Sequence, residues 1–333
     1  MRTLFATICV TLLLMLTPTA RAGIQTKEIE YKHGELTLKG FLAWDDASKD
    51  KRPGVMVVHE WWGLNDYAKS RCKQLAELGY VAFACDMYGN GATTSDPKEA
   101  GKMAGESRKD MKAFRERAAA GLKILADNPM VDKAKLGAIG YCYGGTTVLQ
   151  LACSGADLRA VVSFHGGLFK PTADDAKAIK GKVLICNGAA DTFIQADDRK
   201  ALLESFEANK VDYQFIDYAA AVHAFTNPDA GSFKLDGVAY NENADKRSWK
   251  HMRTLFNEAF DHTTTGDVRN SSGPAPTPLT DDQISKMDKA TATKEWVARK
   301  SYPQKNPGTD AATKSRLDEE VRKLREQMDK GPR

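Results

Sequence analysis

Residues 135–151 read KLGAIGYCYGGTTVLQL, and this stretch decides the fold. Its first half is short and apolar, as expected for a buried strand, whereas residues 146–151 carry apolar side chains without a helix breaker. Between them lies GYCYG at residues 140–144, the pattern G-x-C-x-G centred on Cys142. Glycines are needed where a sharp strand-to-helix turn brings helix and strand close together. The stretch therefore predicts a strand, a tight turn that presents Cys142, and a helix.

Cys142 is a candidate nucleophile because of where this turn places it. It would lie at the carboxyl end of a strand and at the N-terminus of a helix, where the helix dipole favours a thiolate. With serine at its centre, the same pattern is the nucleophile elbow of the α/β-hydrolases. A packed cysteine in a glycine-rich turn would look the same locally, so the assignment depends on the rest of the chain.

Strands and helices alternate through residues 54–260, which predicts an α/β fold with a mostly parallel central sheet and helices on both faces. Residues 24–44 alternate by two around a turn and predict an antiparallel edge hairpin. Further strands are expected at 54–59, 80–85, 158–164, 182–187 and 211–218. Helices are expected at 65–78, 106–126, 197–210 and 244–260, with a loop or short helix at 90–105.

Polar residues follow the predicted strands at the edge where active sites of parallel sheets lie. Asp191 comes after strand 182–187, and His223 lies in the loop after strand 211–218. The α/β-hydrolases carry nucleophile, acid and histidine in this order along the chain. We therefore expect Cys142, Asp191 and His223 to form a catalytic triad.

Further candidate site residues surround the triad in this interpretation. Glu60 follows strand 54–59 and would face the nucleophile, although a surface acid beside a turn is the alternative. The backbone N–H groups of Trp61 and Tyr143 are the expected oxyanion donors. Four residues near strand ends are expected to line the substrate pocket: His59, Tyr88, His165 and Phe225.

Six segments together resemble the dienelactone hydrolase family: HEWWGLNDYA (59–68), CDMYG (85–89), GYCYGGTTVL (140–149), VSFHGG (162–167), NGAAD (187–191) and AVHAF (221–225). The resemblance implies an α/β-hydrolase that cleaves a small ester or lactone through a thioester on Cys142. It matches Asp191 and His223 to the acid and base of the family, and Glu60 to the glutamate that pairs with the resting cysteine. It implies no metal and no organic cofactor.

The chain departs from this family at two positions. Dienelactone-cleaving members hold the substrate carboxylate with arginines, one after the D-x-Y segment and one shortly after the histidine. This chain has GN at 89–90 and TNP at 226–228, so a bidentate carboxylate clamp is not visible there. Three arginines of the expected long helix are alternatives: Arg108, Arg115 and Arg117.

The two ends of the chain differ in character from the hydrolase-like domain, which we place at residues 23–262. Residues 1–22 have a positive start, an apolar run and an Ala-x-Ala ending, which predicts a signal peptide cleaved after Ala22 and an exported, periplasmic or secreted protein. Residues 263–279 are rich in Pro, Ser and Thr and predict a linker. Residues 280–333 are charged and favour a partly helical or disordered extension, with partner binding by its helix as the alternative.

The composition excludes several classes of protein. The net charge of +4 is spread along the chain without a basic stripe, so no nucleic-acid partner is expected. No run after the signal peptide is long enough to span a bilayer, so no stable membrane insertion is expected after cleavage. Without Cys9, five cysteines remain, and the sequence leaves open whether any of Cys72, Cys85, Cys153 and Cys186 pair.

The sequence thus predicts an exported hydrolase of small esters or lactones. Two other functions stay open. An acyltransferase or a hydrolase of envelope-linked esters would use the same residues with another acceptor or substrate. A catalytically idle hydrolase fold that serves as a binding protein is the alternative of another class, because a fold alone does not guarantee an activity.

Overall fold

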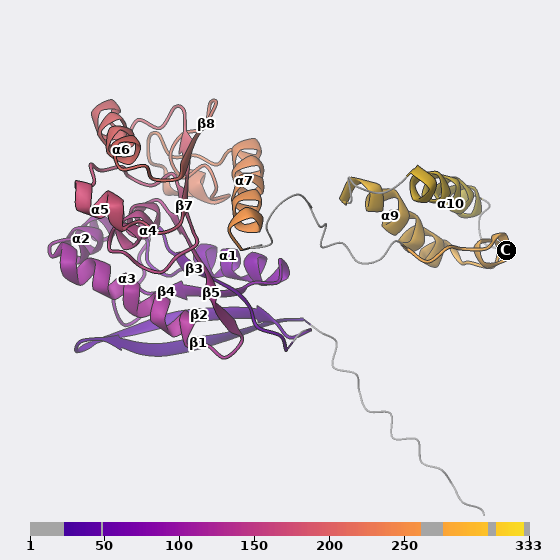
Figure 1. The fold of residues 1–333 in the computed structure, drawn as a ribbon, viewed down its shortest axis with the longest axis horizontal. Helices are drawn as coiled ribbons and strands as arrows, with labels where there is room; N and C mark the ends of the chain where they lie inside the picture. The colour runs from indigo at the N-terminus through magenta and orange to yellow at the C-terminus, as the bar shows by residue number, and fades with distance from the viewer. Residues whose placement is uncertain (1–22, 48, 261–275, 306–310, 330–333) are drawn as a thin grey trace, which may run out of the picture. The chain divides into compact units, whose positions relative to one another are not determined.

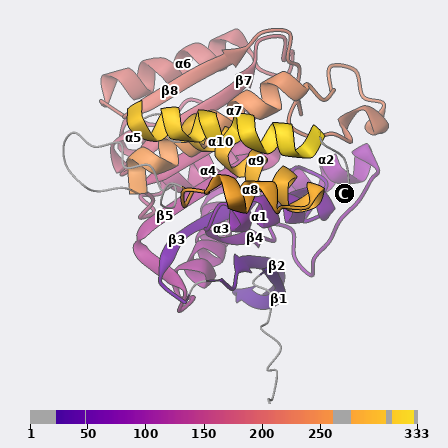
Figure 2. The ribbon, with the colours of Figure 1, turned by 90° about the vertical axis from the view of Figure 1, so that its right-hand side faces the viewer.

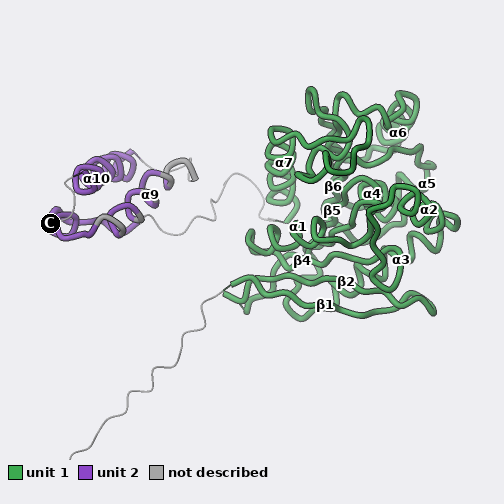
Figure 3. Tube along the Cα trace, turned by 180° about the vertical axis from the view of Figure 1, so that it is seen from behind, with its two compact units in different colours: residues 1–262 green, residues 263–333 purple. Residues whose placement is uncertain are grey.

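The computed structural model describes residues 23–47, 49–260, 276–305 and 311–329. The chain divides into two compact units, Met1–His262 and Thr263–Arg333, which have different colours in Figure 3. The predicted signal peptide and most of the predicted linker lie outside the described residues. Among the helices of the described ranges, none is both long and apolar enough to cross a membrane.

The first unit is built on an eight-stranded sheet with the order β1-β2-β4-β3-β5-β6-β7-β8. β1 and β2 form the antiparallel hairpin predicted from residues 24–44, β2 pairs antiparallel with β4, and all other neighbours are parallel. Figure 2 shows β1 and β2 at one edge of the sheet and β8 towards the other. The predicted fold class is confirmed. The strands are β1 Ile24–His33, β2 Leu36–Asp45, β3 Arg52–Val58, β4 Val81–Cys85, β5 Val131–Tyr141, β6 Ala160–Phe164, β7 Lys182–Gly188 and β8 Tyr213–Tyr218.

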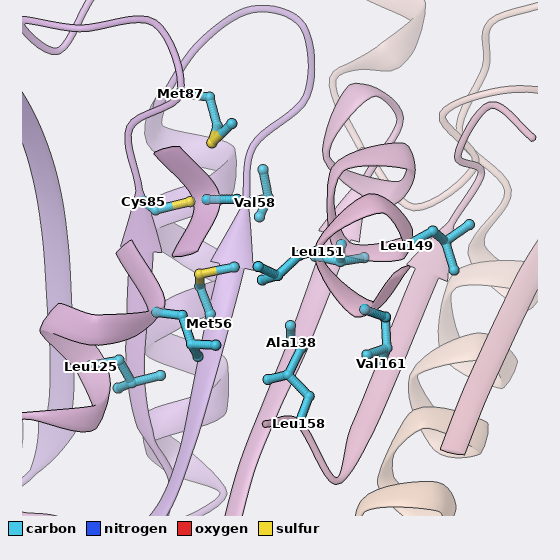
Figure 4. Packing of buried hydrophobic residues seen from close by; sticks show 14 of the residues in the cluster. Met56, Val58, Cys85, Met87, Leu125, Ala138, Leu149, Leu151, Leu158 and Val161 are labelled. Carbon is cyan, nitrogen blue, oxygen red and sulfur yellow. The ribbon is translucent and has the colours of Figure 1, made fainter. Parts of the chain in front are cut away.

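Helices cover both faces of this sheet, as Figure 1 shows. α1 (Asp66–Glu77) and α7 (Glu242–Phe260) pack on one face, and α3 (Met111–Ala126), α4 (Tyr143–Cys153) and α6 (Ala196–Ala208) pack on the other. Successive strand residues alternate between the two cores. Val55 and Val57 of β3 join the α1 and α7 side, whereas Met56 and Val58 point into the core drawn in Figure 4.

Two helical features differ from the prediction. The helix expected at 106–126 begins only at Met111, as α3, because three residues separate it from α2 (Pro97–Ser107), which occupies much of the segment expected as a loop or short helix. Asp110 starts α3 as its N-cap, and its carboxylate accepts the N–H groups of Lys112 and Ala113. No glycine or proline lies between the two helices, so the sequence contains no helix breaker from which this break could be predicted. A short helix, α5 (Ala173–Ala178), was not predicted.

The turn between β5 and α4 consists of Cys142 alone, whose φ of 53° and ψ of −114° are strained for a side chain with a Cβ. Glycines make this turn possible. A Cβ on Gly140 would lie 2.0 Å from the carbonyl oxygen of Gly144, and a Cβ on Gly144 would lie 2.2 Å from the carbonyl oxygen of Val58. The predicted elbow is therefore present, and it is held by close backbone contacts on both sides of the cysteine.

The described part of the second unit is mostly helical, which is more regular than the partly helical or disordered extension expected from the sequence. It contains α8 (Asp281–Ser285), α9 (Lys289–Lys305) and α10 (Ala311–Asp329). Ile284, Ala292 and Leu324 form a small apolar core. Beside it the buried guanidinium of Arg299 donates from Nε to Oε2 of Glu320 at 2.7 Å. An ion pair of this kind joins residues far apart in the chain, so the charged composition is compatible with a packed unit.

Replacing Gly140 by Ala should destabilise the first unit by about 3 kcal/mol, since the added Cβ meets backbone that cannot yield cheaply. Gly105→Ala is the matched control. Its Cβ would have no neighbour within 4 Å in α2, so it should stabilise the unit by roughly 0.5–1 kcal/mol. Urea unfolding measures both changes, and equal effects of the two substitutions would contradict the close contact.

Candidate active site

The carboxyl edge of the parallel strands brings together Cys142, Asp191 and His223. Cys142 follows β5, Asp191 follows β7 and His223 follows β8. His223 Nδ1 lies 2.8 Å from Oδ2 of Asp191, and the N–H of Phe193 donates to Oδ1 of the same carboxylate at 2.9 Å. The Asp191 side chain is fully buried. This acid is therefore fixed and can orient the imidazole.

His223 and Cys142 line the same cavity, and the two side chains interact electrostatically. Since Nδ1 is occupied by Asp191, Nε2 is the ring nitrogen left to exchange a proton with the sulfur. Burial disfavours the charged imidazole, but Cys142 and the bond to Asp191 outweigh burial and raise the pKa of His223 to about 10. The site therefore favours an imidazolium beside the sulfur at neutral pH.

Glu60 lies in the same cavity as Cys142, two residues after β3. It is 2% exposed, and its Oε2 accepts a hydrogen bond from Nδ2 of Asn227 at 2.7 Å. Burial raises the pKa of Glu60 to about 7, although Asn227, His223 and Arg71 each act to lower it. The alternative of a surface acid is wrong, because the Glu60 side chain is buried and its pKa lies near neutral pH.

Trp61 and Tyr143, the expected oxyanion donors, both line the cavity. Tyr143 is the first residue of α4, so its N–H has no acceptor within the helix and is available to a ligand. The loop of Trp61 is held from the other side, because the Tyr88 hydroxyl donates to the Trp61 carbonyl oxygen at 2.9 Å. The two residues thus line the same space, Trp61 from the loop after β3 and Tyr143 from the start of α4.

Neither of the two predicted pocket histidines lines this cavity. His165 Nδ1 accepts the N–H of Cys142 at 3.1 Å, and its Nε2 lies 2.7 Å from the Thr226 hydroxyl. His59 Nε2 accepts the N–H of Met87 at 3.2 Å. Both rings are fully buried, and burial lowers the pKa of each. They hold the backbone around the site as neutral rings and do not face the substrate space.

Tyr88 and Phe225 also lie outside the cavity lining. Tyr88 packs edge-on against the His59 ring, and Phe225 packs edge-on against the His165 ring. The sequence placed these residues near strand ends, but it gave no sign of which way their side chains point. All four predicted pocket residues therefore support the wall from behind.

The cavity itself has a volume of about 350 Å³. Much of its wall comes from a segment that the sequence analysis did not single out, Asp229–Tyr240, which we call the cover segment. It includes the short helix η1 (Ala230–Phe233). The lining residues that sequence reasoning missed are Trp62, Ala104, Thr146, Gly167, Phe193, Ala224, Phe233, Leu235, Asp236 and Val238.

Of the three candidate arginines, Arg108 lines the cavity, with its guanidinium carbon 4.6 Å from the centre of the Tyr143 ring. Arg115 is committed elsewhere, since it pairs with Asp175 at 2.7 Å. Arg117 donates to the Met87 carbonyl oxygen. Arg108 follows the last residue of α2, and no apolar periodicity distinguishes it from its neighbours, so sequence alone could not select it.

All five cysteines of the described ranges are free thiols. Four are buried, and burial raises the pKa of the Cys153 and Cys186 thiols to about 12. Cys142 is the half-buried one and lines the cavity. Within the described part of the chain, no group of three His, Cys, Asp or Glu side chains is placed to hold a metal ion.

Comparison with known proteins places most of the first unit in one family. The model described as "Dienelactone hydrolase family" matches residues 38–260. Protein usf of Aquifex pyrophilus is 32% identical over 208 residues, 60% of this chain and 86% of that protein. The carboxymethylenebutenolidase of Pseudomonas putida is 27% identical over 199 residues, 58% of this chain and 83% of that protein. A solved structure, the dienelactone hydrolase-like promiscuous phosphotriesterase P91 from metagenomic libraries, is 41% identical with a TM-score of 0.70 and covers 72% of this chain and 99% of that one.

Glu60→Gln should change the pH dependence of folding. The pKa of Glu60 rises from 4.5 to about 7 in the folded protein, so its stabilising effect is complete below pH 4.5 and is lost as pH rises through 7. The wild type should therefore lose about 3 kcal/mol relative to the variant between about pH 4.5 and pH 8. Urea unfolding at several pH values measures this difference, and parallel curves for both proteins would contradict the shift.

Proposed function

We propose that this chain, which belongs to the dienelactone hydrolase family and is an ester or lactone hydrolase similar to the carboxymethylenebutenolidases, acts through an acyl-thioester on Cys142. The observation that carries this proposal is the arrangement of Cys142, His223 and Asp191 at one edge of the sheet, with the His223–Asp191 bond at 2.8 Å. A cysteine on a strained elbow, an adjacent imidazole and a buried orienting acid together suit nucleophilic attack on a carbonyl.

In the first half of the reaction, the thiol proton resides on Nε2 of His223. The thiolate of Cys142 attacks the ester carbonyl carbon, a C–S bond forms, and the carbonyl electron pair moves onto oxygen. The N–H groups of Trp61 and Tyr143 stabilise that oxyanion. When the tetrahedral adduct collapses, the C–O bond breaks and His223 gives its proton to the departing alkoxide, which leaves as an alcohol.

In the second half, a water molecule cleaves the thioester. His223 removes a proton from the water as its oxygen attacks the acyl carbon, and the C–S bond breaks to return the thiolate. The acid product leaves, and the sum is ester plus water to acid plus alcohol. Asp191 keeps the Nδ1 proton on the side away from the sulfur and stabilises the imidazolium at each stage.

Glu60 is proposed to regulate the nucleophile. Glu60 lines the same cavity as Cys142, and an ionised carboxylate there opposes a second negative charge. Its pKa of about 7 and its single strong partner, Asn227, make its charge sensitive to whatever enters the cavity. In this proposal a substrate that displaces the Glu60 carboxylate removes this opposing charge and completes the activation of Cys142.

A second substrate class follows from one comparison. The 41% identical relative P91 is described as a promiscuous phosphotriesterase, and the present chain covers 99% of it. Neutral phosphotriesters are therefore a second candidate substrate, with the same cysteine as the nucleophile. An activity panel for this protein should include aryl esters, a lactone and a phosphotriester.

We further propose that the protein is exported and that residues 1–22 are removed. The support is the sequence pattern alone, with its positive start, apolar run and small-residue ending. Expression of the full chain in a Gram-negative host should yield a periplasmic protein whose intact mass corresponds to a start at Gly23. A cytoplasmic protein that retains residues 1–22 would refute this.

Cys142→Ala should lower kcat/KM on this panel by a factor on the order of 10⁴, because no other nucleophile replaces the thiolate. Cys153→Ala is the matched control and should keep activity, since burial raises the pKa of that thiol to about 12. Intact mass after rapid quenching should show one acyl group on the wild type and none on Cys142→Ala. An adduct on another residue, or equal losses in both variants, would refute the mechanism.

A further inference from the structure

We infer that Phe193, Phe233, Leu235 and Val238 bind the apolar alcohol portion of the ester, which is the part attached to the departing oxygen. We call these four residues the alcohol wall. The inference rests on the proposed function and extends it to a substrate class: esters of neutral, apolar alcohols longer than about three carbons, a cut-off of the order that hydrophobic pockets resolve.

All four residues of the alcohol wall line the cavity that contains Cys142 and His223. Phe193 is 55% exposed, more than Met111 and Tyr240, the other exposed large apolar side chains of the described residues. An exposed aromatic ring at the mouth of a cavity has an apolar surface to offer to a ligand. Phe233 adds a second ring, which stacks on the buried Trp62 with ring centres 4.3 Å apart.

The alcohol wall lies on the His223 side of the cavity. The Phe193 ring centre is 5.1 Å from the centre of the His223 ring, at an interplanar angle of 67°. Val238 forms a β-bridge with His223. Main-chain hydrogen bonds join the His223 loop to the cover segment. The His223 N–H donates to the Gly237 oxygen at 3.1 Å, and the Ala239 N–H donates to the His223 oxygen at 3.2 Å.

The chemistry decides which part of the substrate meets this wall. His223 delivers its proton to the departing oxygen, so that oxygen must lie within hydrogen-bond reach of Nε2. The carbon chain bonded to the oxygen therefore leaves the reacting carbon on the side of His223. In the proposed mechanism the carbonyl oxygen of the ester is held away from His223, between the N–H groups of Trp61 and Tyr143. Only the alcohol portion is brought against the alcohol wall by this geometry.

The charge of the cover segment selects among alcohols. Asp236 lies between Leu235 and Val238 in the chain and also lines the cavity. A carboxylate on the alcohol portion would meet this acid, whereas a neutral alkyl or aryl group would meet only the apolar neighbours. Arg108 also lines the cavity and comes from the end of α2, so the acyl portion of the substrate can have a different charge preference from the alcohol portion.

Two matched ester series test the inference. The first varies the alcohol of acetate esters from propyl to hexyl, and the second varies the acid of methyl esters from butanoate to octanoate, so that leaving-group basicity stays nearly constant within each. In the wild type, kcat/KM should rise about tenfold along the alcohol series. Phe193→Ala and Leu235→Ala should each reduce that rise to about threefold or less, whereas the ratio of kcat/KM between the longest and shortest acyl chains should stay as in the wild type.

Phe193→Leu, which keeps an apolar side chain, should restore most of the alcohol-length preference. Met111→Ala is the control, since Met111 is 39% exposed at the start of α3, outside the cavity lining, and should change neither series. Phe193→Ala removes a side chain that is mostly exposed, so it is the variant least able to disturb folding.

Two outcomes would overturn the inference. Either both alanine variants keep the wild-type alcohol preference, or they flatten both series equally, which would indicate general damage to His223. Two other results would refute the proposed function itself. If the wild type hydrolyses no ester of either series, or if Cys142→Ala retains full activity, the proposed function fails and the alcohol wall fails with it.

Discussion

The close approach of α4 to the end of β3 is the constraint on which the site depends. Gly144 lies so near that a Cβ would be 2.2 Å from the Val58 oxygen and 2.7 Å from the His59 oxygen. Because α4 begins directly after Cys142, this contact fixes the nucleophile. Because Glu60 and Trp61 follow His59, it also fixes the carboxylate and one oxyanion donor. A single helix–strand contact thus sets the relative positions of groups from two distant stretches of sequence.

A network of buried polar contacts connects the loop that carries His223 to the turn that carries Cys142. The guanidinium of Arg71 is 5% exposed and donates to the Thr226 carbonyl oxygen at 2.6 Å and to Asp245 at 2.7 Å. Thr226 in turn contacts the ring of His165, which accepts the N–H of Cys142. The loop that carries His223 is therefore tied to the elbow by buried polar contacts, each of which would be costly to leave unpaired.

The sequence was a good guide to everything that depends on strand order. Apolar runs predicted the sheet, and the polar residues after its strands predicted that Cys142, Asp191 and His223 converge. It failed where function depends on side-chain direction. His59 and His165 end strands as expected, yet their rings bond to backbone groups and neighbouring side chains instead of facing the cavity. The cover segment was missed because a wall built from a loop has neither period two nor period 3.6 to mark it.

The main-chain bonds at the two ends of the cover segment have a consequence for how this protein can diversify. Ala230 bonds back to Asn227, and Gly237 and Ala239 bond to His223, all through backbone atoms. Backbone bonds are indifferent to the side chains between them. Phe233, Leu235 and Asp236 can therefore be exchanged during evolution, or randomised in a library, while the proton donor keeps its place. New substrate ranges can then arise from a handful of substitutions without rebuilding the catalytic apparatus.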